Sequence, residues 1–157
     1  MAQGYSQDPY YKHQGLSYLG VTLDGSMTIG PTEDYESAKS TLKECTGGGV
    51  ILIQNSEIQA GKVLMPGRDP RTALGYTSDN VVWILAVDGR HKGVQGMTYV
   101  EMASIFKALG CEAAVNLDGG GSTTLWTEKT GVINYPCDNK KYDHEGERSV
   151  PNLIVVY

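Results

Sequence analysis

Apolar residues recur at helical spacing between residues 98 and 110, and both ends of that stretch carry helix-boundary signals. Thr98 and Glu101 have the spacing of a capping box, in which each side chain satisfies a backbone N–H of the first turn. Gly110 stands where a glycine commonly follows a helix. The apolar positions between these signals are Met102, Ile105, Phe106 and Leu109. The pattern therefore predicts a helix over residues 99–109.

A second helix is predicted to start near residue 32. Thr32 would be its N-cap, and the apolar positions on one face are Tyr35, Ala38 and Leu42. The triple glycine at residues 47–49 has no carboxylate beside it, so we interpret it as a connector beyond the end of this helix.

Short apolar runs and clusters of β-branched and aromatic residues predict the strands. Asp24-Gly25 lies between two such runs, which is typical of a hairpin turn. The predicted strands cover residues 18–23, 26–29, 50–53, 72–77, 81–87, 111–117, 122–127, 132–133 and 153–156. Residues 134–149 form a polar loop. This order predicts an α+β fold, a single compact domain with a mixed, largely antiparallel β-sheet and two principal helices.

The segment from Asn116 to Thr124 reads Asn-Leu-Asp-Gly-Gly-Gly-Ser-Thr-Thr and follows a predicted buried strand. Three glycines beside a carboxylate allow close approach to the backbone, and free N–H groups there would suit an anion. A plain glycine-rich loop between two strands is the alternative interpretation. The segment is no P-loop, because no lysine follows Gly121, and no dinucleotide fingerprint, because a predicted strand follows rather than a helix.

Composition sets limits on the function. The 157 residues are 40% hydrophobic and 20% charged, which is typical of one globular domain. The net charge of −5 and the dispersed basic residues argue against a nucleic-acid partner. No apolar run reaches the roughly 20 residues of a membrane span. Three scattered cysteines do not have the spacing of a zinc site.

Residues 97–125 resemble the signature of the phosphodiester glycosidase family. The resemblance extends in order through Arg71–Gly75, Val87–Arg90 and Gly96–Thr98, and ends in Arg148–Asn152. It implies a hydrolase that cleaves the bond between a sugar's anomeric carbon and a phosphodiester oxygen, with a phosphosugar or glycan as substrate. It also implies a phosphodiester-glycosidase-like domain over residues 31–157, preceded by an N-terminal tail and hairpin over residues 1–30.

One part of the family pattern is missing. Family members usually carry an Asn-Gly-Gly-aromatic-aromatic motif near the N-terminus, and nothing like it occurs before Tyr35. We expect either a fragment of a longer protein, or a shortened form whose pocket is completed otherwise or whose activity is lost. The resemblance also bears on localisation, because members of this family are often secreted or located at the cell surface. Since polar residues rather than an apolar signal segment follow Met1, the localisation stays open.

The implied reaction needs a carboxylate near an oxocarbenium-like centre and donors for the phosphate. Asp118 is the first choice for the carboxylate, with loop capping as its structural alternative. Asp88 stands at the end of another predicted strand, and a plain turn at Asp88-Gly89 explains it equally well. His91 is the candidate proton donor near neutral pH. The expected phosphate- and substrate-binding residues are Arg71, Arg90, Asn116, Gly119, Gly120, Gly121, Ser122, Thr123, Arg148 and Asn152.

No cofactor is certain. Carboxylate, hydroxyl and carbonyl oxygens around Asp118 and Asp88 would suit Ca²⁺ or Mg²⁺ better than zinc, although no EF-hand spacing supports a metal.

Two other functions remain open. A shortened relative would hold a phosphosugar without cleaving it. A structural domain of a larger surface or virion protein would use the tyrosines of the N-terminal tail, Tyr5, Tyr10 and Tyr11, as a docking strand.

Overall fold

The computed structural model describes residues 16–62 and 67–156, so the tail tyrosines lie outside the described residues. The described residues divide into two compact units. The first, here called the sheet unit, takes its residues from Met1–Gly67, Ala73–Leu85 and Thr98–Leu117. The second, here called the loop unit, consists of Arg68–Thr72, Ala86–Met97 and the described part of Asp118–Tyr157.

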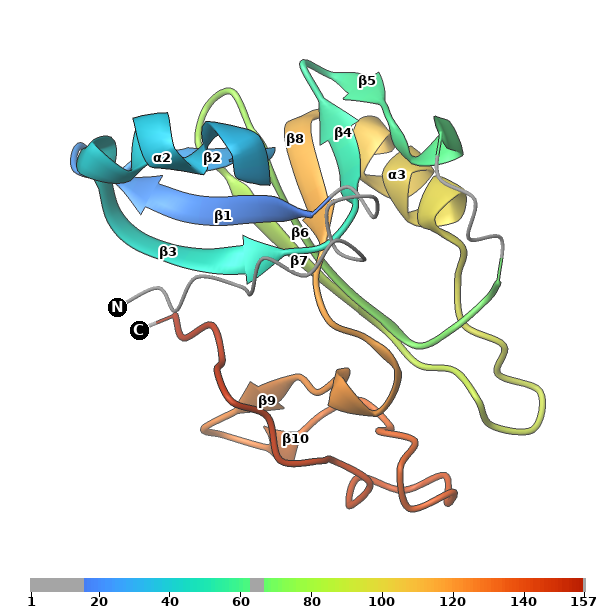
Figure 1. Ribbon diagram of the computed structural model, residues 1–157. Coiled ribbons are helices and arrows are strands. Elements are labelled where there is room, and N and C mark those ends of the chain that lie inside the picture. Colours follow the sequence, from blue (N-terminus) through green and yellow to red (C-terminus); the bar gives the residue numbers. More distant parts are fainter. Residues whose placement is uncertain (1–15, 63–66, 157) are drawn as a thin grey trace. The chain divides into compact units, whose positions relative to one another are not determined.

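The sheet unit contains two β-sheets and most of the helical segments (Figure 1). One sheet has the order β2-β1-β3, and the other has the order β5-β4-β8-β6-β7. Every strand pairing with a determined register is antiparallel. The strands are β1 (Ser17–Thr22), β2 (Met27–Pro31), β3 (Leu42–Gly48), β4 (Ile51–Gln54), β5 (Glu57–Ile58), β6 (Arg71–Thr77), β7 (Val82–Val87) and β8 (Cys111–Asn116).

The core of this unit forms between the two sheets. Leu19 and Ile29 from the small sheet pack against Leu74, Ala113 and Val115 of the large one. Side chains alternate along a strand, so the neighbours of Leu74 point to the opposite face of the sheet. That face carries α3 (Tyr99–Ala108), whose fully buried Phe106 lies so close to Gly75 that a Cβ there would be 2.7 Å from its ring.

The predicted helix over residues 99–109 is confirmed, with one residue less at its end. Thr98 accepts a hydrogen bond from the Glu101 N–H, and the Glu101 carboxylate accepts one from the Thr98 N–H, which completes the capping box. The hairpin at Asp24-Gly25 is also confirmed: β1 and β2 pair on either side of it.

The second helix is shorter than predicted. It consists of three short pieces, η1 (Thr32–Asp34), α2 (Tyr35–Ala38) and η2 (Lys39–Thr41), and Pro31 rather than Thr32 is its N-cap. Strand β3 then begins at Leu42, so the interpretation of residues 47–49 as a connector was wrong for Gly47 and Gly48. Gly48 pairs with Ser17, and a Cβ there would lie 2.5 Å from the Ser17 hydroxyl oxygen. Close contact between strands explains this glycine.

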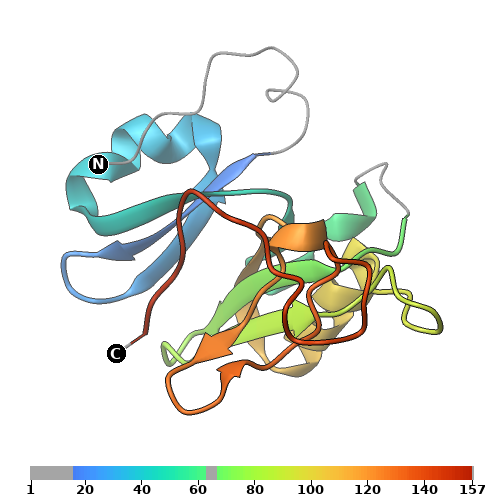
Figure 2. The same ribbon diagram turned by 90° about the horizontal axis from the view of Figure 1, so that it is seen from below.

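The loop unit has little regular structure. It contains η4 (Gly120–Ser122) and a two-stranded sheet of β9 (Trp126–Thr127) and β10 (Gly131–Val132), seen from below in Figure 2. The predicted strand over 122–127 was therefore wrong in its first half, because the N–H groups of Ser122 and Thr123 donate back to Gly119 and Gly120 and coil the chain. Residues 153–156, predicted as a strand, are described without regular structure.

Candidate functional site

The glycine loop is held against the segment before β6. The Gly120 N–H donates to the Pro70 carbonyl at 2.9 Å, and a Cβ on Gly119 would lie 2.7 Å from that same oxygen. Gly120 has φ +62°, a left-handed conformation that favours glycine. Asp118 is exposed and accepts a hydrogen bond from the Gly119 N–H at 2.9 Å. The tandem glycines are thus required by backbone geometry and by close approach.

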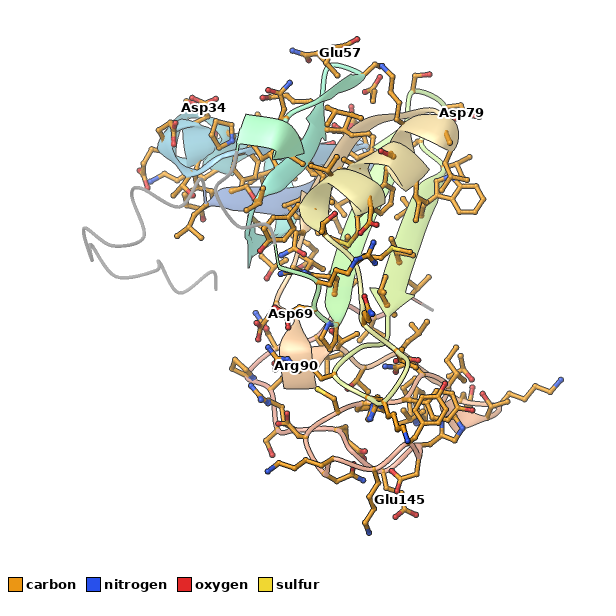
Figure 3. The ribbon with its side chains drawn as sticks, turned by 90° about the vertical axis from the view of Figure 1, so that its right-hand side faces the viewer. Asp34, Glu57, Asp69, Asp79, Arg90 and Glu145 are labelled. Carbon is orange, nitrogen blue, oxygen red and sulfur yellow. The ribbon has the colours of Figure 1, made fainter. Side chains whose placement is uncertain are left out.

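Two arginines converge on Asp69. The Arg90 Nε donates to Asp69 Oδ1 at 2.9 Å, and an Arg71 terminal nitrogen lies 3.7 Å from Asp69 Oδ2. Figure 3 shows the labelled side chains of Asp69 and Arg90 next to each other. Arg71 is only 7% exposed and also donates to the Met97 carbonyl at 3.3 Å. Asp69 raises the pKa of the Arg90 guanidinium, so this group stays cationic at every relevant pH.

Charged groups cover two successive glycines of the loop. A Cβ on Gly120 would lie 2.8 Å from a terminal nitrogen of Arg90, and a Cβ on Gly121 would collide with the Asp138 carboxylate. Asp138 in turn accepts two hydrogen bonds from Arg148, at 2.5 Å from Nε and 2.9 Å from the terminal nitrogen. This pairing, with a smaller contribution from Arg90, lowers the pKa of the Asp138 carboxyl, which favours its ionised form.

Asp88 and Asn134 connect three segments of the loop unit. Asp88 Oδ1 accepts hydrogen bonds from the Asn134 side chain at 3.0 Å and from the Tyr135 N–H at 2.9 Å. The buried Asn134 amide also donates to the Thr123 carbonyl and accepts from the Leu125 N–H. Asp88 therefore holds the first residues of the 134–149 loop in place.

His91 lies among aromatic rings. Its Nε2 is 3.1 Å from the Tyr135 carbonyl oxygen, and its ring meets Tyr142 edge-on at 5.2 Å between centroids. His144 is exposed and its ring lies tilted against that of Tyr135.

The other predicted residues are distributed more widely. Thr123 is buried, and the Thr72 hydroxyl lies 3.4 Å from its own; Ser122 is partly exposed. Asn116 belongs to the sheet unit, where it ends β8, and its buried Oδ1 has no hydrogen-bond partner among the described residues. Asn152 is exposed near the C-terminal end.

The predicted acidic, basic and histidine residues thus all belong to the loop unit, and the structure adds three residues that sequence reasoning missed. Arg71, Arg90, Arg148, Asp118 and the glycines belong to it with Asp88 and His91. The residues missed are Asp69, Asp138 and Asn134. Asp69-Pro70 stands directly before the predicted Arg71, and that proximity was the available signal for Asp69. The polar loop 134–149 gave no pattern that singled out the other two.

No group of three or more His, Cys, Asp or Glu side chains in residues 16–62 and 67–156 has an arrangement that would hold a metal ion. Within the same residues, none of the helices has the length and apolar character to cross a membrane.

Comparison with known proteins decides the family. The sequence profile described as phosphodiester glycosidase matches residues 3–157, almost the whole chain. The chain belongs to the phosphodiester glycosidase family. The resemblance drawn from the sequence motifs is therefore confirmed, and membership suggests a hydrolase.

Two relatives of this phosphodiester glycosidase family member are an uncharacterized prophage-derived protein and a named enzyme. Over 137 residues it is 35% identical to the SPbeta prophage-derived uncharacterized protein YomE of Bacillus subtilis (strain 168), matching 80% of this chain and 21% of that one. Over 139 residues it is 27% identical to N-acetylglucosamine-1-phosphodiester alpha-N-acetylglucosaminidase of Bos taurus, matching 77% and 26%. The chain thus spans about a fifth to a quarter of the length of these relatives.

The fold agrees with solved structures. The catalytic domain of zebrafish N-acetylglucosamine-1-phosphodiester alpha-N-acetylglucosaminidase, auto-inhibited by its pro-peptide, matches with a TM-score of 0.66 at 25% identity, over 77% of this chain and 45% of that one. A putative exported protein of Burkholderia pseudomallei K96243 matches with a TM-score of 0.50 at 17% identity, over 87% and 39% respectively, and shows the fold alone. The prediction of an α+β fold is confirmed.

Proposed function

We propose that this chain hydrolyses a sugar-1-phosphodiester, for example an α-N-acetylglucosaminyl-1-phosphodiester, at the bond between the anomeric carbon and the phosphate oxygen. The observation that carries the proposal is the pair of arginines at the glycine loop, Arg90 beside Gly120 and Arg148 on the carboxylate that covers Gly121. Guanidinium groups are the usual partners of phosphate, because their planar donors match its oxygens. The name of the bovine relative supplies the sugar used as an example.

Phosphate recognition is assigned to side chains rather than to the loop amides. The N–H groups of Gly119, Gly120, Ser122 and Thr123 all donate within the protein. A guanidinium has five N–H donors, and Asp69 takes one of those of Arg90. Arg90, with the Ser122 hydroxyl, therefore fits a phosphate oxygen better than the backbone does. Arg71, which is buried and pairs with the same Asp69, would contribute further positive charge.

The carboxylate at the anomeric carbon is proposed to be Asp118. Asp138 is a weaker choice, because both of its oxygens accept from Arg148 and its pKa is held low. Asp118 is exposed at the edge of the glycine loop, and its Oδ1 accepts a hydrogen bond from the next N–H. In the proposed reaction water forms the new bond to the anomeric carbon, the C–O bond to phosphate breaks, and the phosphomonoester leaves with the electron pair. The water proton passes to a carboxylate or to solvent.

The test is release of free sugar from an α-N-acetylglucosaminyl-1-phosphodiester by the wild type and by Asp118→Asn. We expect turnover by the wild type and a loss of at least about a hundredfold in the variant, the range for removing a general acid or base. Asp34→Asn, which changes an exposed aspartate of the sheet unit, is the matched control and keeps full turnover. An Asp118→Asn protein with normal turnover, or one that is unfolded, would remove Asp118 from this role.

A second candidate is a module that binds a phosphosugar without cleaving it. The hydrogen bond from the Gly119 N–H to Asp118 Oδ1 favours it, because it fits a loop-capping role for Asp118 rather than a catalytic one. It predicts saturable phosphosugar binding by wild type and Asp118→Asn alike, with no free sugar released by either.

A further inference from the structure

Four aromatic rings gather at one place in the loop unit. Tyr142 stacks on Tyr135 with 4.0 Å between ring centroids and 6° between planes. His91 meets Tyr142 edge-on, and His144 lies tilted against Tyr135 with 4.3 Å between centroids. We refer to these four side chains as the ring cluster.

The backbone that carries the ring cluster is fixed. The Tyr135 N–H donates to Asp88, and the Tyr135 carbonyl contacts His91 Nε2. His144 Nδ1 lies 2.7 Å from the Asn134 carbonyl oxygen. On the other side of the loop, the Asn139 amide donates to the Asp143 carboxylate at 2.7 Å. Tyr142 therefore sits on a loop that is closed at both ends, and its ring loses little further freedom when it is contacted.

Tyr142 nevertheless leaves much of its ring in water. The residue is 58% exposed, although Tyr135 covers one of its faces. His91 also contacts this ring, so the exposed part is the ring surface that Tyr135 and His91 leave uncovered. A packing role alone would bury the ring, since burial of aromatic surface is what stabilises such contacts.

We propose that the exposed part of the Tyr142 ring is a binding surface for the sugar ring of the substrate. The face of an aromatic ring carries partial negative charge, and the C–H groups on one side of a pyranose present weak positive charge and apolar surface to it. This inference rests on the proposed function and divides recognition in two: the ring cluster takes the neutral sugar, and the arginines take the phosphate.

Chain connectivity places the two parts within reach of one substrate. Arg90, beside the glycine loop, and His91, in the ring cluster, are consecutive, so their Cα atoms are about 3.8 Å apart. On the 134–149 loop, Tyr135 of the ring cluster is three residues from Asp138, the partner of Arg148. All these residues belong to the loop unit.

The experiment separates sugar from phosphate with two probes, N-acetylglucosamine and inorganic phosphate, titrated by NMR into the full chain. Tyr142→Ala should weaken N-acetylglucosamine binding about tenfold, the equivalent of about 1.4 kcal/mol, and leave phosphate binding unchanged. Tyr142→Phe keeps the ring face and should bind as the wild type does. The control is Trp126→Ala, which removes another exposed aromatic ring, 62% exposed, from the same unit and should change neither titration.

The outcomes decide between sugar binding and packing. Equal N-acetylglucosamine binding by wild type and Tyr142→Ala overturns the proposal, as does a wild type that binds phosphate but no sugar. A parallel loss of both ligands with a lower melting temperature also overturns it, because it shows that Tyr142 only holds the loop. Selective loss of sugar binding supports it even if no turnover is found, so failure of the hydrolase proposal would be recognised separately.

Discussion

Asn134 connects three segments of the loop unit through one buried amide, and its removal should destabilise that unit strongly. Its Nδ2 donates to Asp88 Oδ1 at 3.0 Å and to the Thr123 carbonyl at 2.9 Å, while its Oδ1 accepts from the Leu125 N–H at 2.8 Å. The residue is 8% exposed, so water cannot readily replace these partners. Asn134→Ala leaves two backbone groups and a carboxylate without the amide.

The magnitude follows from the three bonds. A hydrogen bond between neutral groups contributes about 1 kcal/mol net, and one to a charged group about 1.5–3 kcal/mol. Asn134→Ala should therefore lower the free energy of unfolding by about 3.5–5 kcal/mol. Since domains of this size have about 5–15 kcal/mol in total, the variant should remain folded at low temperature but with a clearly reduced urea midpoint.

The assay is urea unfolding followed by Trp126 fluorescence in a Trp83→Phe background. Trp126 belongs to the loop unit and Trp83 to the sheet unit, so this background reports on the unit that contains Asn134. Asp88→Ala and the double variant complete a cycle, whose coupling energy should be about 1.5–3 kcal/mol because the shared bond is charge-assisted.

Asn139→Ala is the control for this cycle, because its amide bonds stay within its own short loop. It should show no coupling to Asp88, since the two residues share no hydrogen-bond partner within the described part of the chain. A loss below about 1 kcal/mol for Asn134→Ala, or no coupling to Asp88, would refute the assignment of Asp88 and Asn134 as the connection between these segments.

Three further predictions concern capping, pH and thiol reactivity. Thr98→Ala should lower the free energy of unfolding by about 0.5–2 kcal/mol in urea, because it removes the acceptor of the capping box. The pKa of Asp138 lies below its ordinary value of 3.8, so its pairing with Arg148 stabilises the fold above pH 3.8. This stabilisation is lost as the pH falls through the lowered pKa. Asp138→Asn should therefore flatten the decline of the melting temperature with falling pH, measured as a pH series. Burial raises the pKa of the Cys111 thiol, so mass spectrometry should find alkylation of Cys111 by iodoacetamide at least about tenfold slower in the native protein than in urea; equal rates would contradict it.

Local signals predicted the elements that depend on neighbouring residues. The α3 boundaries follow from Thr98, Glu101 and Gly110, and the capping bonds form as the spacing indicates. The first hairpin follows from Asp24-Gly25, where Gly25 has φ +87°. In these segments each residue's conformation is set by partners within four positions, so the sequence suffices.

Strand β3 shows where local reasoning failed. Leu42 continues the apolar helical pattern of Tyr35 and Ala38, but the chain extends there and pairs with β1. The pairing joins Gly48 to Ser17, far away in the sequence, and the packing of Gly48 against Ser17 and Val115 decides the structure. Tertiary contact overrides helical propensity in such a segment.

Local patterns also limit what the sequence predicts of the candidate site. Motif resemblance identified the arginines and glycines, but the partners that orient them are distant: Asp69 is 21 residues from Arg90, and Asn134 is 46 residues from Asp88. Asp138 is nearer to Arg148, 10 residues away, yet it lies in a loop without periodicity. Side-chain pairs across loops leave no spacing rule that a single sequence can reveal.

The glycines of the loop acquire a different role from the one first inferred. Tandem glycine suggested backbone N–H groups aimed at an anion, but the amides of Gly119 and Gly120 are engaged by Asp118 and Pro70. What the missing side chains permit is the close approach of Arg90 to one glycine and of a carboxylate to the next. Each arginine already has a carboxylate partner, so a phosphate gains affinity only through donors that the partner leaves unused or by displacing that carboxylate. Selectivity for a doubly esterified phosphate over a simple anion then has to come from the sugar, which is why an exposed aromatic ring in the same unit as these arginines matters to the proposed reaction.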